Sequence, residues 1–235
     1  MEVLEGLTAA QVATLLGIVS LVDLAAVAVF AITGALVAAR REMDPIGFVF
    51  LGTVTGVGGG TFRDLVLGIE PVFWIARPEY LWTCIGASLI TFWAARLLAS
   101  RYKALVWMDA VGLAMFAITG TQKAVAIGAP AVVCVLMGVM TATVGGLIRD
   151  IMAGQKPLLF HREIYATAAI AGSVTYLLAR VVDLPEPLAA IAGFAVGFGV
   201  RALAIAFGMS MPAYKRPDKP LDGPAEGPPE GPSAG

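Results

Sequence analysis

Long apolar runs, separated by short polar joints, make up most of the chain. A helix needs about 20 mainly apolar residues to cross a bilayer, and seven runs are close to this length. They occupy residues 18–39, 45–69, 80–98, 105–123, 130–153, 164–182 and 187–207. Residues 7–17 either extend the first run or lie flat at the membrane interface. The pattern therefore predicts an all-α integral membrane protein with seven transmembrane helices.

The segment after the seventh run has a different composition. Beyond Met211 the chain consists largely of Pro, Gly, Lys, Asp and Glu. Such a segment cannot bury enough apolar surface to offset the entropy of ordering it. We therefore expect a membrane domain over residues 1–212 and a disordered tail over residues 213–235.

A sequence repeat relates the two halves of the apolar region. A shift of 86 residues places Asp23 on Asp109 and segment 30–34 on the identical segment 116–120. Without a gap, the same shift also aligns the two copies of a Gly-Gly-x-x-Arg-Asp motif. Each unit contains three apolar runs, an odd number, so the second unit must cross the membrane in the opposite direction. This predicts an inverted repeat of two three-helix units, at about 18–98 and 105–182, with a seventh helix at about 187–207.

Basic residues in the joints predict the orientation, because short cytoplasmic loops carry an excess of Lys and Arg. One side of the predicted bundle receives Arg40, Arg41, Arg96, Arg101, Lys103, Lys156, Arg162, Lys215, Arg216 and Lys219. The other side receives Arg77, Lys123 and Arg180. We therefore expect a multi-pass protein of the cell inner (plasma) membrane, with its N-terminus outside and its C-terminus in the cytoplasm.

Composition narrows the function classes. The chain is 58% hydrophobic and 14% charged, whereas soluble domains carry about a quarter charged residues. The formal net charge of −1 and the lack of a basic cluster give no indication of nucleic-acid binding. No nucleophile–base pair or metal-ligand pattern stands out, so we expect no enzyme activity, catalytic residue, bound metal or cofactor.

Glycines and charges lie together, deep inside two of the apolar runs. The segment 58–64 reads Gly-Gly-Gly-Thr-Phe-Arg-Asp, and 145–150 reads Gly-Gly-Leu-Ile-Arg-Asp. Glycine weakens a helix interior, and a charge in hydrocarbon indicates function. We therefore predict helix breaks whose freed carbonyls coordinate a cation, with Thr61 and Asp64 forming a capping box for the restarted helix. Alternatively, the glycines only permit close helix packing.

The charged residues of the two motifs predict a polar interior. Adjacent helical residues point about 100° apart, so Arg63 and Asp64 are not expected to pair with each other, and neither are Arg149 and Asp150. Each then needs a partner on another helix or in water. We expect a central, hourglass-shaped cavity walled by the second and fifth runs, although an Arg–Asp salt bridge between the two units is also compatible with the pattern.

Three further charges have two interpretations each. Asp23 and Asp109, near the starts of the first and fourth runs, either stabilise helix N-termini or line a polar path. Lys123, at the end of the fourth run, either extends to the interface or takes part in function. The candidate kink and pore residues are Gly58, Gly59, Gly60, Thr61, Gly145 and Gly146, and the candidate pore charges are Arg63, Asp64, Arg149, Asp150, Lys123, Asp23 and Asp109.

Through these motifs the chain resembles the prokaryotic branch of the TRIC (trimeric intracellular cation) channel family, members of which are also described as glycine transporters. The resemblance rests on segments 58–64, 71–74 and 145–150 and on the duplicated three-helix layout. It implies a homotrimer in contact with membrane lipids, with one pore per protomer that conducts K⁺ and Na⁺ past two glycine-kinked helices. It also implies a voltage-response role for a basic residue of the fourth helix, for which Lys123 is the candidate.

Two main functions follow. The first is a channel for monovalent cations, in which a permeant K⁺ or Na⁺ lies near the kinks. The second is a secondary transporter of a small zwitterion such as glycine, because a helix N-terminus and Arg63 suit a carboxylate while Asp64 suits an ammonium group. A membrane scaffold without flux is a third, weaker alternative.

Overall fold

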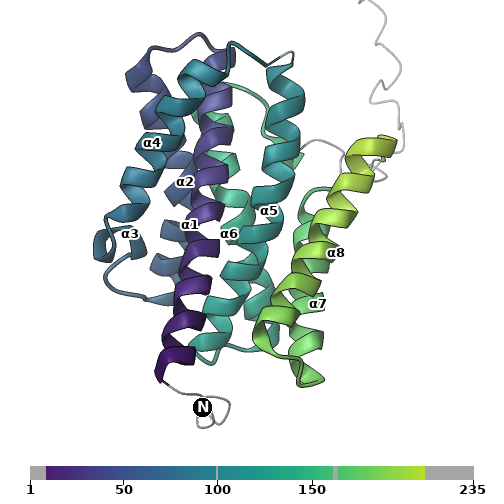
Figure 1. Cartoon of the computed structure of the whole chain (residues 1–235). Coiled ribbons are helices and arrows are strands. Elements are labelled where there is room, and N and C mark those ends of the chain that lie inside the picture. Colours follow the sequence, from purple (N-terminus) through teal and green to yellow (C-terminus); the bar gives the residue numbers. More distant parts are fainter. Residues whose placement is uncertain (1–8, 99, 161–163, 210–235) are drawn as a thin grey trace, which may run out of the picture.

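The computed structural model describes residues 9–98, 100–160 and 164–209, and within these ranges the chain is helical (Figure 1). The predicted disordered tail, residues 213–235, lies outside the described residues. The helices are α1 (Ala9–Arg40), α2 (Pro45–Leu67), α3 (Phe73–Ala76), α4 (Glu79–Ala94), α5 (Arg101–Ala126), α6 (Ala131–Met152), α7 (Ala166–Val181) and α8 (Glu186–Phe207), with a short 3-10 helix, η2 (Leu158–Phe160), before α7.

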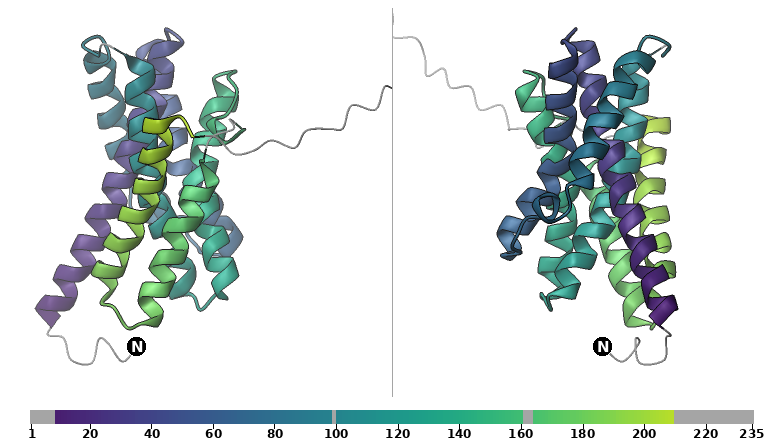
Figure 2. Two further views of the ribbon diagram at one scale, coloured as in Figure 1. Left: turned by 90° about the vertical axis from the view of Figure 1, so that its right-hand side faces the viewer. Right: turned by 60° about the vertical axis from the view of Figure 1, so that its left-hand side comes forward.

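The longer helices form an elongated bundle in which successive helices run in alternating directions (Figure 1). Helix α2 packs against α1, α4 and α6, and α5 packs against α1 and α6. Helices α7 and α8 pack on each other at one side of the bundle (Figures 1 and 2). The four helices α1, α2, α5 and α6 therefore enclose the centre of the molecule.

The seven predicted runs correspond to the seven helices longer than α3. Five of them, α1, α2, α5, α6 and α8, are long and apolar enough to cross a membrane. Helices α4 and α7 have 16 residues each, so they are shorter than the runs predicted at 80–98 and 164–182. Residues 9–17 of the ambiguous segment extend α1, which begins at Ala9, and residues 7 and 8 lie outside the described residues.

Local signals fix several helix ends. The Asp44 carboxylate accepts a hydrogen bond from the Gly47 amide at 2.7 Å, and Pro45 follows as the first helical residue of α2. The same helix ends at Gly68, whose φ of 66° is easily reached only by glycine. At the end of the bundle where α1 and α4 end and α5 begins, the Arg101 guanidinium donates to the Ala95 and Ala39 carbonyls at 3.2 and 3.3 Å. This side chain therefore satisfies carbonyls at the ends of both α4 and α1.

Aromatic side chains from the two repeat units meet at the core. Phe30 and Phe116 occupy equivalent positions of the repeat, and their rings make an edge contact with centroids 4.8 Å apart. Both side chains are fully buried, at 0 and 1% exposure. The contact joins α1 to α5, so the centre of the bundle is built from matching residues of the two units.

The predicted glycine breaks are wrong, because α2 and α6 are uninterrupted α-helices through Gly58–Gly60 and Gly145–Gly146. Gly58, Gly59 and Gly145 instead allow the two helices to touch, whereas Gly60 faces the Phe73 ring and Gly146 faces Arg149 and Tyr165. A Cβ at Gly145 would lie 2.6 Å from the Thr55 carbonyl oxygen of α2, and a Cβ at Gly59 would collide with the Thr141 carbonyl of α6. Small residues permit such close backbone contact. Consequently the helical hydrogen bonds are kept, and no freed carbonyl is available for a cation at these positions.

This packing predicts the effect of enlarging the contact. Gly59→Ala places a methyl group against backbone that cannot rotate away, and we expect it to lower the free energy of unfolding by about 1–3 kcal/mol, as overpacking does. The measurement is the thermal unfolding midpoint of the purified protein in detergent.

Two matched controls come from glycines with open surroundings. A Cβ at Gly86 of α4 or Gly199 of α8 meets no atom within 4 Å. Alanine at either position should be neutral or stabilising by up to about 1 kcal/mol, because alanine favours the helix. A Gly59→Ala protein as stable as these controls would contradict the packing explanation.

Candidate functional site

The first charged pair of the repeated motif lies on α2, inside the bundle. The Arg63 Nε donates to Asp64 Oδ1 at 2.8 Å, and its Nη2 lies 2.7 Å from the same oxygen. Exposure of the two side chains is 1% and 0%. The prediction that these neighbours do not pair is wrong, because the arginine side chain is long enough to fold back along the helix surface to the adjacent carboxylate.

The Asp64 carboxylate also fixes the segment that follows α2. Its Oδ2 accepts a hydrogen bond at 2.9 Å from the amide of Phe73, the first residue of α3. The Phe73 ring in turn contacts two cations: the Arg63 guanidinium carbon lies 5.6 Å from the ring centroid, and the Lys123 ammonium lies 5.7 Å from it. Arg63, Asp64 and Phe73 are called the first cluster below. Lys123 is half-buried beside it, at the end of α5.

The predicted capping box at Thr61 is not formed. Because α2 does not restart there, no free helix N-terminus is present for the Thr61 hydroxyl to cap. The hydroxyl instead donates to the Val57 carbonyl, one turn earlier, at 2.8 Å, and accepts a hydrogen bond from the Trp74 indole at 2.9 Å. Thr61 therefore attaches α3 to α2, next to the first cluster.

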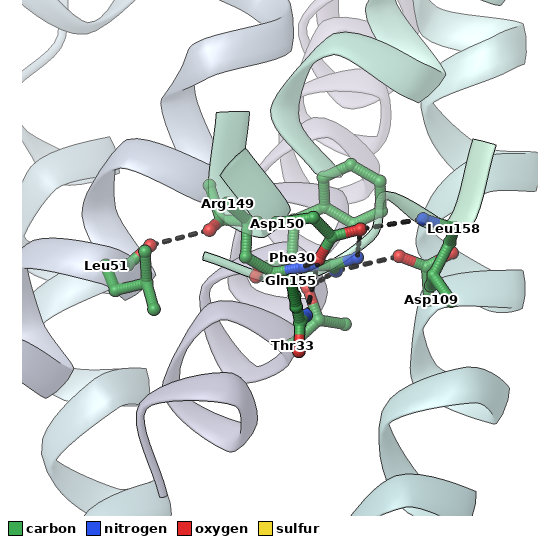
Figure 3. Close-up of polar contacts among 9 residues, drawn as sticks. Phe30, Thr33, Leu51, Asp109, Arg149, Asp150, Gln155 and Leu158 are labelled. Atoms are coloured by element: carbon green, nitrogen blue, oxygen red, sulfur yellow. Dashed lines mark hydrogen bonds and ion pairs between the residues drawn. The ribbon is translucent and has the colours of Figure 1, made fainter. Parts of the chain in front are cut away.

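The second charged pair lies on α6 and joins three helices (Figure 3). The Arg149 Nε donates to Asp150 Oδ1 at 2.7 Å, so neighbours pair here as well. In addition, the Arg149 Nη1 donates to Asp109 Oδ1 of α5 at 2.8 Å and to the Thr33 hydroxyl of α1 at 3.0 Å. All four side chains are buried, with at most 1% exposure. They form the second cluster, which connects the two repeat units.

The Asp150 carboxylate repeats the anchoring role of Asp64. Its Oδ2 accepts from the Leu158 amide, at the start of η2, at 2.9 Å. Its Oδ1 accepts from the Gln155 side chain at 2.8 Å (Figure 3). Each motif carboxylate therefore neutralises its neighbouring arginine and positions the segment that follows its helix.

Asp23 and Asp109 do not act as helix N-terminal anions, so that interpretation is wrong. Asp23 lies well inside α1, and Asp109 lies two turns into α5. They also differ in their partners. Asp109 binds the second-cluster arginine, whereas Asp23 accepts a hydrogen bond from the Tyr80 hydroxyl at 2.8 Å. Equivalent carboxylates of the repeat are thus engaged by a cation in one unit and by a neutral hydroxyl in the other.

A cavity of about 560 Å³ opens beside the first cluster. Three acidic side chains line it (Asp23, Glu70 and Glu186), and so do two basic side chains, Arg77 and Lys123. The pKa of Arg77 is raised, mainly by its 2.6 Å hydrogen bond to Glu79, so it remains charged. Lys123 therefore lines this cavity and covers an aromatic ring, rather than extending away from the protein.

Neither this cavity nor the smaller one that borders Asp64 is lined by residues of the second cluster. The two clusters therefore differ: the cavity borders the first, and the side chains of the second are buried, with at most 1% exposure. In the described ranges, no group of three or more His, Cys, Asp and Glu side chains is placed to hold a metal ion. Paired charges beside a polar cavity are suited to admitting small ions.

Sequence reasoning missed several partners of these charges. Thr33 and Gln155 carry no signal beyond polarity. Tyr80, the partner of Asp23, has a counterpart in Tyr165, which lies beside Asp109. Extending the repeat with a one-residue gap would have aligned these two tyrosines. Arg201 of α8 is fully buried, with its guanidinium 5.1 Å from the Tyr165 ring centroid, and it lies outside the repeat altogether.

Comparison with known proteins gives consistent results. Residues 20–96 and 106–180 match the sequence model of a family described as Glycine transporter. The TRIC trimeric intracellular cation channel orthologue from Rhodobacter sphaeroides is 48% identical; the superposition has a TM-score of 0.80 and covers 82% of this chain and 99% of that one. A structure described as the structural basis for conductance through TRIC cation channels is 34% identical, with a TM-score of 0.76, covering 85% of this chain and 98% of that one.

A curated relative gives the same result at the level of sequence. The UPF0126 inner membrane protein YadS of Escherichia coli is 39% identical over 197 residues, which cover 82% of this chain and 94% of the relative. These similarities extend over both repeat units.

The different partners of the two equivalent aspartates predict different costs of neutralisation. Asp109→Asn removes a charge-assisted hydrogen bond from Arg149 and should lower the free energy of unfolding by about 1.5–3 kcal/mol. Asp23→Asn keeps an acceptor for Tyr80 and should cost less than about 1 kcal/mol. Unfolding midpoints of the two variants in detergent test this difference, and equal losses would show that the Arg149–Asp109 contact contributes nothing special.

Proposed function

Because the chain belongs to the TRIC family, we propose that it is a channel for the monovalent cations K⁺ and Na⁺, with one pore in each protomer. The similarity to solved TRIC cation channels, at 48% identity to one of them, supports this. The protein is an all-helical membrane protein with five long apolar helices. The proposed membrane is the cell inner (plasma) membrane, as for the curated E. coli relative.

The observation that carries the proposal is a cavity, bordered by five charged side chains, beside the charged groups of the central helices. The cavity reaches Asp23 and Thr119, on α1 and α5, and Phe73 of the first cluster. The second cluster lies farther along the central helices α1, α5 and α6. Buried charges are costly unless they are paired, and their retention inside an apolar bundle indicates an ion pathway. The proposed path therefore runs from the cavity through the first cluster to the second.

The seven longer helices are proposed to cross the membrane as an inverted repeat. Helices α4 and α7 are roughly 24 Å long at 1.5 Å per residue, a few ångströms less than the bilayer core, and adjoining turns can make up the difference. The proposed units span about 18–98 and 105–182, followed by a seventh helix at about 187–207, in a proposed membrane domain over residues 1–212. The contact of Phe30 with Phe116 supports a symmetry axis at the core.

The excess of basic residues on one side supports a cytoplasmic location for the joint between α1 and α2. The N-terminus is then outside and the C-terminus is cytoplasmic. In this orientation the cavity faces the outside, because it lies at the opposite end of the bundle from that joint. Cations would enter the protein from the cavity side through polar space that is already formed.

The second cluster is proposed to close the path in this conformation. Arg149 is completely buried and holds three oxygen-bearing side chains together, so a cation can pass only if these contacts separate. Lys123, beside the first cluster, is the candidate for a voltage response. Its charge lies within the proposed membrane span, where a change in potential does work on it.

Self-association as a homotrimer is proposed from the trimeric TRIC orthologue. Exposed apolar side chains on α4 and α8, such as Trp82 at 71% and Ile191 at 62%, suit contact with lipid tails or with another protomer. A membrane setting requires such a surface, since apolar side chains facing lipid need no cover.

A transporter of a small zwitterion such as glycine is the second candidate. The observation in its favour is that the cavity presents a cation, Lys123, and a carboxylate, Asp23, in one space. The family description as Glycine transporter agrees with this alternative. A channel and a carrier differ in the kind of flux they produce, so one set of measurements separates them.

Recordings from the purified protein in planar bilayers test the proposal. We expect unitary cation currents with little discrimination between K⁺ and Na⁺. Asp64→Asn leaves the Arg63 charge without its carboxylate, and the unpaired positive charge repels a passing cation. The conductance should fall by about tenfold for each 1.4 kcal/mol that this adds to the free-energy barrier for ion passage. Glu79→Gln, which removes an exposed carboxylate paired with Arg77, is the control and should change conductance by less than about twofold.

Saturable uptake and counterflow of labelled glycine into proteoliposomes, without unitary currents, would contradict the channel and favour the carrier. Normal conductance in Asp64→Asn, in a protein that elutes as the wild type does, would remove Asp64 from the path.

A further inference from the structure

The repeat allows the surroundings of equivalent residues to be compared directly. The shift of 86 residues places Asp23 on Asp109, Thr119 on Thr33 and Arg63 on Arg149. In the second cluster, one carboxylate and one threonine hydroxyl together hold a cationic nitrogen. Arg149 Nη1 lies 2.8 Å from Asp109 Oδ1 and 3.0 Å from Thr33 Oγ1. In the second cluster, the Asp109–Thr33 pair therefore binds a cationic group.

The equivalent pair in the other half has different surroundings. Asp23 and Thr119 both line the cavity of about 560 Å³. Arg63, the equivalent of Arg149, pairs with Asp64 and makes no ion pair with Asp23 among the described residues. Asp23 and Thr119 therefore border a cavity, with the Thr119 hydroxyl oxygen buried at its wall, whereas their counterparts bind a guanidinium group.

The Thr119 hydroxyl provides an independent sign of a ligand. The residue is only 5% exposed, and its Oγ1 has no hydrogen-bond partner in the described part of the chain. Its counterpart, Thr33, donates to the Phe30 carbonyl and accepts from Arg149. A buried hydroxyl that makes no hydrogen bond is costly. The cost is removed when a group in the cavity binds the hydroxyl oxygen.

We propose that Asp23 and Thr119 form a binding site for a monovalent cation at the inner end of the cavity. Asp23 supplies the charge and a carboxylate oxygen, and Thr119 supplies a neutral oxygen. The Tyr80 hydroxyl, which donates to Asp23 Oδ2, keeps the carboxylate in place. Because the second cluster binds a guanidinium nitrogen in this way, the site accepts small guanidinium ions as well as K⁺ and Na⁺.

The charges near the pair favour a monovalent ion over a divalent one. Asp23 is the only carboxylate of the pair, and the charge of Lys123 acts on the same region. Hard divalent cations take six or more oxygen ligands, usually including several carboxylates. One carboxylate and one hydroxyl supply too few oxygen ligands for a hard divalent cation, so Ca²⁺ and Mg²⁺ are disfavoured.

The role of the site in conduction rests on the proposed channel function, but binding can be measured without any flux. In crystals of the full-length protein grown with Tl⁺, a heavy analogue of K⁺, we expect an anomalous peak between the Asp23 carboxylate and the Thr119 hydroxyl. Asp23→Asn should abolish the peak, and Thr119→Val, which keeps the side-chain shape, should weaken it. Glu70→Gln removes an exposed carboxylate from the same cavity and should leave the peak unchanged.

An absent peak in the wild type, or an equal peak in Asp23→Asn, would overturn the site. The result is also separable from the channel proposal. A Tl⁺ peak in a protein that passes no current would keep the site and reject the channel, whereas current without a peak would keep the channel and reject the site.

Block by methylguanidinium gives a second readout in bilayers. Applied from the cavity side, it should block wild-type currents. Asp23→Asn should weaken the block by about tenfold or more, as expected for the loss of a charged hydrogen-bond acceptor, and Thr119→Val by roughly threefold, as for a neutral one. Glu70→Gln should stay within about twofold of the wild type. Equal block of wild type and Asp23→Asn would contradict the proposed ligand class.

Discussion

Burial of the guanidinium groups of the two repeated motifs, Arg63 and Arg149, inside an apolar bundle is the constraint on which the structure depends. A buried charge is tolerated only when it is paired and hydrogen-bonded. Here the residue that follows each arginine provides the carboxylate, and the same carboxylate also accepts an amide hydrogen bond from the segment after the helix. Each carboxylate therefore neutralises its arginine and also positions the segment after its helix. The central helices are arranged around these two motifs.

The two motifs consist of equivalent residues, but their surroundings differ. In the second cluster, Arg149 draws Asp109 and Thr33 together and fills the centre of the bundle. In the first, Arg63 pairs with Asp64 and faces an aromatic ring, and Asp23 and Thr119 lie beside a cavity. Equivalent residues of the repeat thus border a cavity in one half and hold a buried arginine in the other. This asymmetry is compatible with the proposed entry of ions from the cavity side.

The sequence was sufficient for the helices, because hydrophobic run length is a strong signal. The ungapped repeat singled out the two Arg-Asp motifs, but it gave no indication of the buried Arg201 of α8. It was not sufficient for the role of the glycines. Glycine weakens a helix and also permits close packing, and only the tertiary contact of Gly59 with α6 decides between the two. The pairing of Arg63 with Asp64 was missed because helical geometry places adjacent Cβ atoms apart, while a long side chain can still fold back. Partners supplied by another helix, such as Thr33 and Tyr80, have no local signature.

Ions are proposed to pass from the cavity through the first cluster and then through the second. Cysteine accessibility along this route tests it most directly, in a background where Cys84 and Cys134 are replaced by serine. A positively charged thiol reagent applied from the cavity side should reduce the current of Thr119→Cys at once, and of Thr33→Cys only while the channel is open. Currents that are unaffected at both positions, in variants shown to be labelled, would place the path elsewhere.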